Sequence, residues 1–384
     1  MNCDKVAQIR SALEYARQQI VRKANGALPY DYLVPAGPYS EQWDWDAFFM
    51  GVALASENPQ DACYLKYWAL NCLANMEADG KIPGCITPAG RDVRLNHMKP
   101  FLAQGMLIAA KTLGDFSWVK ESWPALEKTF EYRRKHLWSD RFDLAVWYDS
   151  MESGADNNIA LLDYPPKSVV ACDCNGFVYR EYLAASELAA ETDKPASSKE
   201  FRAFADKLKE RVNKYLWSEQ QESYFNLNAL NGEHIQTVSY SNFIPLWAGM
   251  ATLERGRRMI KKYLLSDDHM KSAFGFRTLS RRDPCYNNIN MIKPHSNWQG
   301  PVWPIANYLY MHALLRYGFK DEAIWAAETI SELVLEDIKK SGGMHENYNA
   351  ETGEPLAAPD FISWNILVRN MLDEALNERD PFQL

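Results

Sequence analysis

The chain has 384 residues, 47% of them hydrophobic, and a formal net charge of −8, so it is long enough to bury a large core. A mildly acidic balance offers no electrostatic footprint for nucleic acid or for an anionic membrane surface, and neither partner is predicted. Charges run through residues 1–22, and no window approaches about 18 consecutive apolar residues, so we expect neither a signal peptide nor a membrane span.

Helical periodicity dominates the chain from its beginning. Val6, Ile9, Leu13, Ala16 and Ile20 recur every three or four residues, as one face of a helix requires. Alternating patterns are scarce, and the best of them, 224–236, has Asn231-Gly232 between two short segments and predicts a surface hairpin. In chain order, helices are predicted over 5–23, 43–57, 61–77, 98–113, 117–136, 168–191, 198–216, 241–251, 254–264, 302–317, 319–338 and 361–376.

Some connections between these helices are short, but others are long and rich in Gly, Pro, Trp and Asp. Long irregular loops in a compact domain are usually functional. About twelve helices with long loops between successive pairs fit a double ring, six inner and six outer, with the long loops at one end; a two-domain helical protein fits less well. No linker or low-complexity tract divides the chain, so we expect a single domain over residues 1–384. The long loops are 24–42, 78–97, 138–167, 265–300 and 339–360.

The first long loop ends in Trp43-Asp44-Trp45-Asp46, where a helix is predicted to begin. Either aspartate could cap that helix or interact with its N-terminal dipole. A carboxylate beside indoles can also bind two neighbouring sugar hydroxyls, and aromatic rings pack against the C–H face of a sugar. Aromatic residues make up 13% of the chain, so both interpretations stay open at this loop.

A second aromatic loop holds Trp298 and Trp303 around Gly300 and Pro301. Pro301 suits the first turn of a helix, so the segment predicts a rigid turn into one. Two tryptophans five residues apart around Gly and Pro are unusual for ordinary core packing. We interpret this loop as one wall of a sugar pocket.

Two further loops present single carboxylates. Asp156 follows Gly154, which allows a tight turn, and could itself be a turn or cap residue. Glu346 follows Gly342-Gly343, and glutamate is a poor turn former, so a structural role is harder to supply for it. Its neighbour His345 has no second His or Cys at ligand spacing in this loop, so we expect a hydrogen-bonded structural histidine and no metal site.

Cysteine usage also argues against a metal or disulfide framework. The seven cysteines are scattered without a CxxC pair, and Cys172 and Cys174 form only a lone C-x-C. Seven is an odd number, so we expect reduced thiols and a cytoplasmic protein. Recognisable motifs for a nucleophilic serine, a P-loop or a zinc protease are missing from the sequence.

Two carboxylates on separate loops are what glycoside hydrolysis needs. One carboxylic acid protonates the leaving oxygen, and the second group either activates water, with inversion, or attacks the sugar itself. The two carboxyls stand about 6.5–9.5 Å apart in the first case and about 5–5.5 Å in the second. The acid must stay protonated near neutral pH, so burial beside aromatic rings should raise its pKa. Sequence spacing gives neither the separation nor the identity of the acid.

At these four loops the sequence resembles glycoside hydrolase family 63 and, more distantly, the trehalase family of the same clan. Within family 63 it is most similar to small bacterial hydrolases that act on mannosylglycerate and glucosylglycerate. The match runs from about residue 30 to the C-terminus. The motifs are Trp45-Asp46 with Phe48-Phe49, Glu152-Ser153-Gly154-x-Asp156-Asn157, Trp298-x-Gly300-Pro301-Val302-Trp303-Pro304 and His345-Glu346-Asn347-Tyr348-Asn349-x-x-Thr352-Gly353.

The resemblance implies an all-α (α/α)6 barrel and an inverting glycosidase that uses no cofactor. It places the general acid at Asp156 and the general base at Glu346. Tyr39 falls where the small hydrolases contact the aglycone. We add Trp43, Tyr348 and Trp364 as candidate pocket residues. The sugar-binding positions of the family fall on Trp45, Asp46, Gln104, Trp298, Gly300 and Trp303.

Larger family members carry an extra N-terminal β-rich domain, for which this sequence has no segment, so a small α-glucoside or α-mannoside is expected. The aglycone is open among glycerate, glycerol and another sugar. Lys99 or Arg94 could meet an acidic aglycone, although both are expected to be surface charges. The sequence does not predict an oligomeric state.

Two other functions stay open for such a barrel. A sugar epimerase or isomerase would use a pair of histidines for proton transfer. A non-catalytic sugar-binding protein would have the same cleft without needing an acid–base pair. The candidate histidines for the first alternative are His97, His234, His295, His312 and His345.

Overall fold

The computed structural model describes residues 2–91, 96–291 and 296–383. Helices dominate them, and each strand has only two or three residues. The helices are α1 (Asn2–Ala12), α2 (Ala16–Ile20), α3 (Asp44–Glu57), α4 (Cys63–Ala74), α5 (Leu102–Leu113), α6 (Ser117–His136), α7 (Ser150–Ser153), α8 (Ile159–Leu162), α9 (Cys172–Glu191), α10 (Pro195–Tyr215), α11 (Ile244–Trp247), α12 (Leu253–Met259), α13 (Pro304–Arg316), α14 (Lys320–Ser341) and α15 (Val368–Asn377). Short 3₁₀ helices cover Pro59–Ala62, Tyr240–Phe243 and Ser363–Leu367, and a π-helix covers Ile260–Leu264.

The strands are short antiparallel pairs within the loops. β3, β4 and β5 form a three-stranded sheet, and the other pairs are β1–β2, β6–β7, β8–β11, β9–β10, β12–β13 and β14–β15. The strands are β1 (Val21–Arg22), β2 (Tyr32–Leu33), β3 (Gln42–Trp43), β4 (Cys85–Thr87), β5 (Gly90–Arg91), β6 (Trp138–Ser139), β7 (Leu144–Ala145), β8 (Val169–Val170), β9 (Trp217–Ser218), β10 (Ser223–Tyr224), β11 (Leu227–Asn228), β12 (Lys271–Ser272), β13 (Gly275–Phe276), β14 (Asn347–Tyr348) and β15 (Pro355–Leu356).

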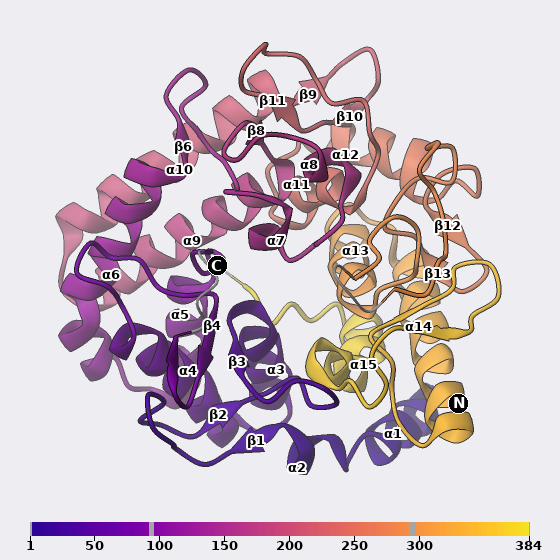
Figure 1. Ribbon diagram of the computed structural model, residues 1–384, viewed down its shortest axis with the longest axis horizontal. Coiled ribbons are helices and arrows are strands. Elements are labelled where there is room, and N and C mark those ends of the chain that lie inside the picture. Colours follow the sequence, from indigo (N-terminus) through magenta and orange to yellow (C-terminus); the bar gives the residue numbers. More distant parts are fainter. Residues whose placement is uncertain (1, 92–95, 292–295, 384) are drawn as a thin grey trace.

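The helices surround the centre of the molecule as a ring (Figure 1). In order around the centre, α3 packs on α5, α5 on α9, α9 on α11, α11 on α13, α13 on α15, and α15 back on α3. Other helices cover this inner set from outside: α4 packs on α5, α10 on α9, and α14 on both α13 and α15. The N- and C-terminal parts of the chain meet where α1 packs on α15.

Burial follows these two layers. In the inner helix α13, every residue from Pro304 to Leu314 is buried, and apart from Asn307 and His312 the stretch is apolar or aromatic. In the outer helix α10 only one stripe, Ala205, Leu208 and Val212, is buried, and its other faces are charged. A helix that is apolar all round belongs inside a protein, whereas a single apolar stripe belongs at its surface.

The C-terminal segment ends at the centre of the ring (Figure 1). The ring of Phe382 contacts Phe49 of α3 at 6.0 Å between centroids and Tyr308 of α13 at 6.0 Å. Trp247 of α11 lies 5.6 Å from it, and Arg180 of α9 donates to its backbone carbonyl. The aromatic side chain thus joins four inner helices at one point.

The predicted helices correspond closely to the observed ones, with local differences. The predicted helix 254–264 ends as a π-helix, and 361–376 begins with a 3₁₀ helix. The first predicted helix is interrupted by a turn at residues 13–15, and the segment 241–251 begins as a 3₁₀ helix with only 244–247 in α-form. The predicted hairpin 224–236 is short: Leu227 and His234 form a bridge, and backbone hydrogen bonds join Asn228 to Glu233 and Ile235 to Asn226. On its other side β11 pairs with Val169–Val170. Among the described residues, no helix is both long and apolar enough to cross a membrane.

Candidate active site

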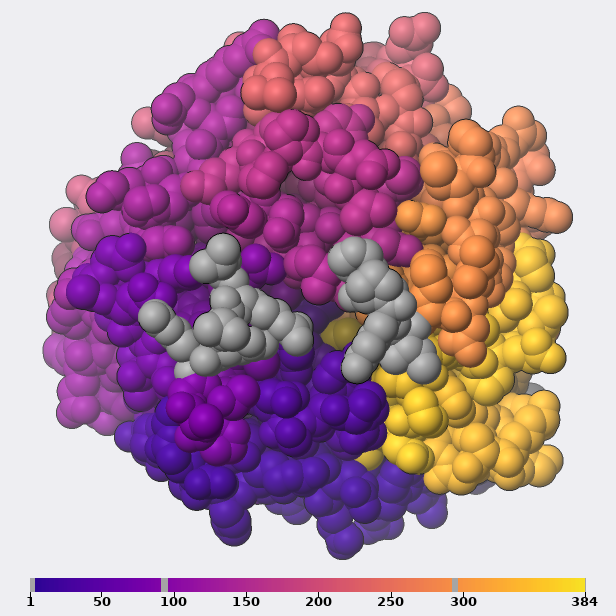
Figure 2. Space-filling view, in the orientation of Figure 1, coloured from indigo at the N-terminus to yellow at the C-terminus, as the bar shows by residue number. Residues whose placement is uncertain are grey.

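A cavity of about 770 Å³ opens near the centre of the ring. The space-filling view shows the molecule hollowed there, with part of the C-terminal region, in yellow, at the bottom of the hollow (Figure 2). Each of the five long loops predicted from the sequence supplies lining residues. They include Tyr39, Cys85, Asp156, Ser296 and Glu346, one from each loop in chain order.

Asp156 reaches the cavity from the loop between α7 and α8. Gly154, which ends α7, has a φ of 80°, and a Cβ there would lie 2.6 Å from the Lys99 side chain and 2.7 Å from the indole of Trp45. Only glycine allows this close approach. Asp156 is half-buried, and its Oδ2 accepts hydrogen bonds from the Ser296 hydroxyl at 2.8 Å and the Ser296 backbone N–H at 3.3 Å.

The Asp156 loop is joined to the loop that precedes α13. The Asn157 side-chain oxygen accepts the backbone N–H of Trp298 at 2.6 Å, and the Gln299 side chain donates to the Asn157 carbonyl at 2.9 Å. Asn157 also donates to the side chain of Asn297 at 3.4 Å. Amide side chains therefore hold the backbone around Asp156 in place.

Glu346 lies in the same cavity and is 5% exposed. Its burial, and after that the negative charges of Asp156 and Asp46, hold the pKa of Glu346 well above its usual value. The two carboxylates predicted to be catalytic are thus brought together from loops that lie far apart in the sequence, close enough for their charges to interact.

A third carboxyl, Asp46, is buried in the first turn of α3. Burial raises its pKa to about 7, against the opposing effects of a hydrogen bond from Ser363 and of the Lys99 charge. The Ser363 hydroxyl donates to its Oδ1 at 2.6 Å. Asp46 can therefore accept or donate a hydrogen bond near neutral pH.

Aromatic rings form much of the cavity wall. Trp45 and Trp364 meet edge to face at 5.3 Å between centroids, and Trp303 lies 5.9 Å from Trp364. Farther along the wall, Tyr39 contacts Trp43 at 6.2 Å. These five rings were predicted from the sequence, and all five line the cavity.

Phe361 is a sixth ring in this wall that the sequence analysis missed. It contacts Tyr39 at 5.8 Å and Trp364 at 5.0 Å, so it joins the two ends of the wall. It is the first apolar residue of the last predicted helix, and only that position hinted at a special role. The rings form a continuous surface on which a sugar can pack.

Four predicted binding residues are not among those that line the cavity: Gln104, Trp298, Gly300 and Tyr348. Gln104 donates to the Pro100 carbonyl at 2.8 Å, and Trp298 stacks behind Trp303 at 4.1 Å with an angle of 19° between the rings. Gly300 is required because a Cβ there would lie 2.1 Å from the Asn287 carbonyl oxygen, and the Tyr348 hydroxyl donates to Asp337 at 2.9 Å. All four thus lie outside the cavity lining, and Trp298 supports it through Trp303.

The expectation that Lys99 is a surface charge is wrong. Its side chain is buried and lines the cavity, with Nζ 3.1 Å from Asp44 and 5.0 Å from the centre of the Trp45 ring. Asp44 also accepts the backbone N–H groups of Trp45 and Lys99, each at 2.7 Å. Asp44 therefore acts as the counter-ion and anchor of Lys99, while Arg94 lies outside the described residues.

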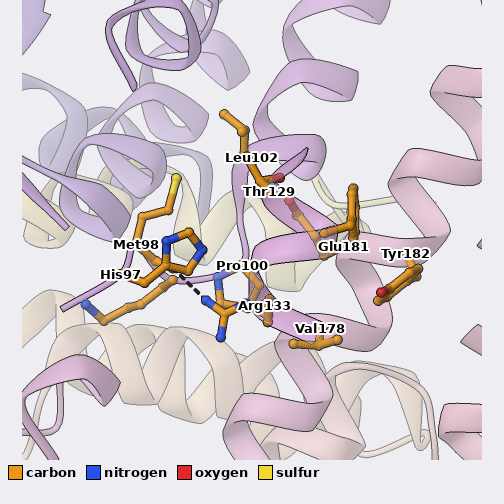
Figure 3. Close-up of a pocket in the computed structure, with 11 residues that line it drawn as sticks. His97, Met98, Pro100, Leu102, Thr129, Arg133, Val178, Glu181 and Tyr182 are labelled. Atoms are coloured by element: carbon orange, nitrogen blue, oxygen red, sulfur yellow. Dashed lines mark hydrogen bonds between the residues drawn. The ribbon is translucent and has the colours of Figure 1, made fainter. Parts of the chain in front are cut away.

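A small cavity of about 20 Å³ adjoins this region around Arg133 (Figure 3). Arg133 of α6 donates to the Met98 carbonyl at 2.7 Å and lies 3.9 Å from Glu152, which also lines the larger cavity. Burial raises the pKa values of Glu152 and Glu181 to about 7, and burial followed by the Arg133 charge lowers that of His97 well below its usual value. This buried cation balances carboxylates beneath the cavity.

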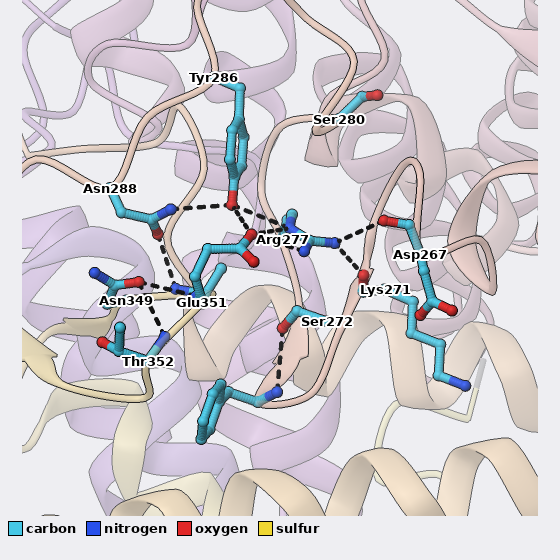
Figure 4. Close-up of polar contacts among 12 residues, drawn as sticks. Asp267, Lys271, Ser272, Arg277, Ser280, Tyr286, Asn288, Asn349, Glu351 and Thr352 are labelled. Atoms are coloured by element: carbon cyan, nitrogen blue, oxygen red, sulfur yellow. Dashed lines mark hydrogen bonds and ion pairs between the residues drawn. The ribbon is translucent and has the colours of Figure 1, made fainter.

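Another buried cation, Arg277, joins the loop that follows β13 to the loop that follows β14 (Figure 4). It pairs with Glu351 at 2.8 Å, and the Tyr286 hydroxyl donates to the same carboxylate at 2.6 Å. Asn288 donates to the Tyr286 hydroxyl at 3.0 Å and accepts the Ala350 N–H at 2.8 Å. The segment after β13 is thereby tied to the turn that follows Glu346.

The histidines offer no pair at the cavity among the described residues, where only His97 contributes to its lining. His312 lies 3.0 Å from Glu374, His345 lies 3.0 Å from Asp337, and His234 lies 2.8 Å from the Tyr215 carbonyl, so each has a hydrogen-bond partner elsewhere. His295 lies outside the described residues. Within the described ranges, no group of three His, Cys, Asp or Glu side chains could hold a metal ion.

Comparison with known proteins gives one family and several relatives. Residues 39–364 match the family model described as the mannosylglycerate hydrolase MGH1-like glycoside hydrolase domain. A mannosylglycerate hydrolase of Rubrobacter radiotolerans is 27% identical over 191 residues, which are 50% of this chain and 40% of that protein. The chain therefore matches less than half the length of this curated relative.

Solved structures share the fold. A family 63 mannosylglycerate hydrolase from Thermus thermophilus, in complex with Tris and D-glycerate, superposes with a TM-score of 0.75 and 18% identity over 95% of this chain and 100% of that one. The neutral trehalase of Saccharomyces cerevisiae gives a TM-score of 0.68 and 18% identity over 91% of this chain and 74% of that one.

Proposed function

The chain belongs to the family of mannosylglycerate hydrolase MGH1-like glycoside hydrolase domains, and from this we propose that it is an inverting exo-α-glycosidase acting on a small α-glucoside or α-mannoside. One observation carries the proposal: Asp156 and Glu346, from distant loops, line a single cavity walled by aromatic rings. A paired acid and base beside a sugar-packing surface is the arrangement that glycoside hydrolysis requires.

In the proposed mechanism Asp156 is the general acid and Glu346 the general base. Asp156 gives its proton to the glycosidic oxygen as the bond to the anomeric carbon breaks. Glu346 takes a proton from a water molecule, whose oxygen attacks the anomeric carbon from the opposite face and inverts its configuration. The raised pKa of Glu346 supports this role, because a carboxylate with a pKa nearer the working pH is a stronger base.

The proposed architecture is a single-domain (α/α)6 barrel over the whole chain. Its support is the closed order of packing contacts from α3 through α5, α9, α11, α13 and α15 back to α3. An outer layer with single apolar stripes, such as α10, is consistent with it. The long loops then lie at the end that holds the cavity.

For the sugar unit to be cleaved, we propose contacts with Trp45, Asp46, Trp303 and Trp364, which line the same cavity as the two carboxylates. The aglycone is proposed to lie against Tyr39 and Trp43, which form the farther part of the aromatic wall. Gln104, Trp298, Gly300 and Tyr348 would shape this wall from behind. The mannosylglycerate and trehalose hydrolysed by relatives define the first substrates to try.

The test is a panel of α-glucosides and α-mannosides that includes mannosylglycerate, glucosylglycerate and trehalose, with the released sugar followed by NMR. Release of the β-anomer at first, from an α-linked substrate, is expected. Release of the α-anomer would overturn inversion. Epimerised sugar without hydrolysis would instead indicate an isomerase, and tight binding without any turnover would indicate a sugar-binding protein.

A further inference from the structure

The loop that carries Glu346 is held by a buried carboxylate behind it, Asp337. Asp337 belongs to the outer helix α14 and is 3% exposed. It is not among the residues that line the cavity, so it would not touch a bound sugar. Its hydrogen bonds nevertheless hold the loop that carries Glu346, which does line the cavity.

Hydrogen-bond donors converge on this carboxylate from both sides of Glu346. His345, the preceding residue, donates its backbone N–H to Oδ2 at 2.9 Å, and its ring Nδ1 lies 3.0 Å from the same oxygen. Tyr348, two residues after Glu346, donates its hydroxyl to Oδ2 at 2.9 Å. Ser341 at the end of α14 donates to Oδ1 at 2.9 Å.

Further bonds fix the same stretch of backbone. Tyr348 exchanges two backbone hydrogen bonds with Val302, at 2.8 and 2.9 Å, and Asn365 donates to the His345 carbonyl at 2.8 Å. Asp337 differs from these anchors because it joins the residues on both sides of Glu346 to one rigid helix. A catalytic group must be held within roughly 0.5 Å of its productive position to work well.

We propose that Asp337 is a positioning residue that holds the general base Glu346 in place, an inference that rests on the proposed function. A carboxylate suits this task because its two oxygens together offer about four acceptor sites for these donors. An asparagine would keep one acceptor oxygen and place an NH₂ group against N–H donors. The His345 side of the loop would then lose at least one bond.

The main test is Asp337→Asn, with kcat and KM measured on the best substrate of the panel. We expect kcat to fall roughly 10- to 100-fold while KM stays within about threefold, because a small misplacement of a catalytic group slows chemistry without weakening binding. The matched control is Glu374→Gln. Glu374 is also buried and accepts the hydroxyl of Tyr308 at 2.7 Å, with His312 Nε2 at 3.0 Å, but its donors lie on α13.

Both variants should lower the melting temperature, whereas only Asp337→Asn should lower kcat. Equal losses of kcat in both variants would overturn the inference, because the effect would then be one of general stability. The double variant with Glu346→Gln gives a further readout. If Asp337 acts through Glu346, Asp337→Asn should change the residual rate of Glu346→Gln by less than about twofold.

A full additional loss in that double variant would overturn the inference, as would normal kcat in Asp337→Asn beside an inactive Glu346→Gln. Normal activity in Glu346→Gln would instead overturn the proposed function. If Asp337→Asn does not fold, Tyr348→Phe removes a single donor and keeps the ring. It should lower kcat roughly three- to tenfold at unchanged KM, whereas a raised KM at normal kcat would mean that Tyr348 contacts the sugar and would overturn the inference.

Discussion

Asp156 lies on a loop held by side-chain amides and a serine, whereas Glu346 lies on a loop held by a carboxylate of an outer helix. Asp156 is half-buried and accepts two hydrogen bonds from Ser296. Glu346 is 5% exposed, and the charges that act on its pKa come from other carboxylates. Donors from one residue, Ser296, thus hold the Asp156 carboxyl in place, whereas burial raises the pKa of Glu346.

This difference bears on one expectation drawn from the sequence. Chemistry suggested that the acid would be the carboxyl buried among aromatic rings, because burial keeps a proton in place. The structure buries Glu346 more deeply, which raises its pKa and makes it a better proton acceptor at neutral pH. Burial in this protein therefore raises the pKa of the proposed base, and the raised pKa expected for the acid stays a prediction.

The largest expected effect separates the two roles by leaving group. Asp156→Asn should lower turnover about 10³-fold on a natural glycoside but far less on a nitrophenyl glycoside or a glycosyl fluoride, whose leaving groups need no proton. Glu346→Gln should lose about the same factor on both substrates, because water must be activated in each case. Steady-state rates on paired substrates measure this, and equal behaviour of the two variants would contradict the assignment.

A smaller effect is expected at Ser296, whose hydroxyl and backbone N–H both donate to Asp156. Ser296→Ala removes the 2.8 Å hydrogen bond to Asp156 and should lower turnover of natural glycosides roughly tenfold, with little effect on activated ones. Ser331→Ala is the control, since Ser331 is also buried but its hydroxyl donates to a carbonyl within α14. An equal loss on natural and activated glycosides would mean that Ser296 does not act through Asp156, and would contradict this prediction.

The pH profile tests the base side. Glu346 must be ionised to accept a proton, and its raised pKa means that kcat/KM should fall on acidification well before the ordinary glutamate range is reached. Asp46→Asn removes one of the neighbouring negative charges and should move this acidic limb to lower pH. An acidic limb at about pH 4.3, the ordinary value for glutamate, would contradict the effect of burial.

The smallest effect concerns stability. A carboxyl whose pKa is raised on folding contributes stability below its unfolded pKa and loses it as pH rises through the folded value. Glu346→Gln should therefore stabilise the protein by about 1–2 kcal/mol at pH 8 and by little at pH 4.5. Asp156→Asn should give no such gain, because Asp156 keeps solvent and donors. Melting temperatures at the two pH values check this. If Glu346→Gln gives no gain in stability at pH 8, the raised pKa of Glu346 is contradicted.

Much of the architecture could be predicted from the sequence. Helix periodicity located nearly every long helix, because inner and outer helices both carry apolar residues at helical spacing. The family resemblance seen in four loop motifs is confirmed by the match over residues 39–364. The loops were found through residues such as Gly154, whose close contacts exclude any side chain.

The position of aromatic residues relative to the cavity could not be predicted. Trp298 and Trp303 occur in the same motif, yet Trp303 lines the cavity and Trp298 stacks behind it. A tryptophan can pack against a sugar or inside a protein core. Sequence spacing alone therefore does not tell which of two tryptophans lies at the cavity surface. Lys99 was misjudged because its partner Asp44 lies 55 positions away in the chain.

Asp337 was missed although the sequence held a signal. It continues the apolar stripe of α14 through Ala323, Ile330 and Val334, where a charged residue is out of place. A charge on a buried stripe requires partners, and in this protein the partners are the residues around the proposed base.

The position of the segment that ends in Phe382 bears on how a substrate can enter the cavity and how products can leave it. Trp45 of the cavity wall contacts Phe49, and Phe49 contacts Phe382, so aromatic layers lie beneath the site. Phe49 and Phe382 thus fill the space between the Trp45 wall of the cavity and the centre of the inner helices. If the chain is the exo-glycosidase proposed above, we expect a longer glycan to enter by one end and both products to leave past the long loops.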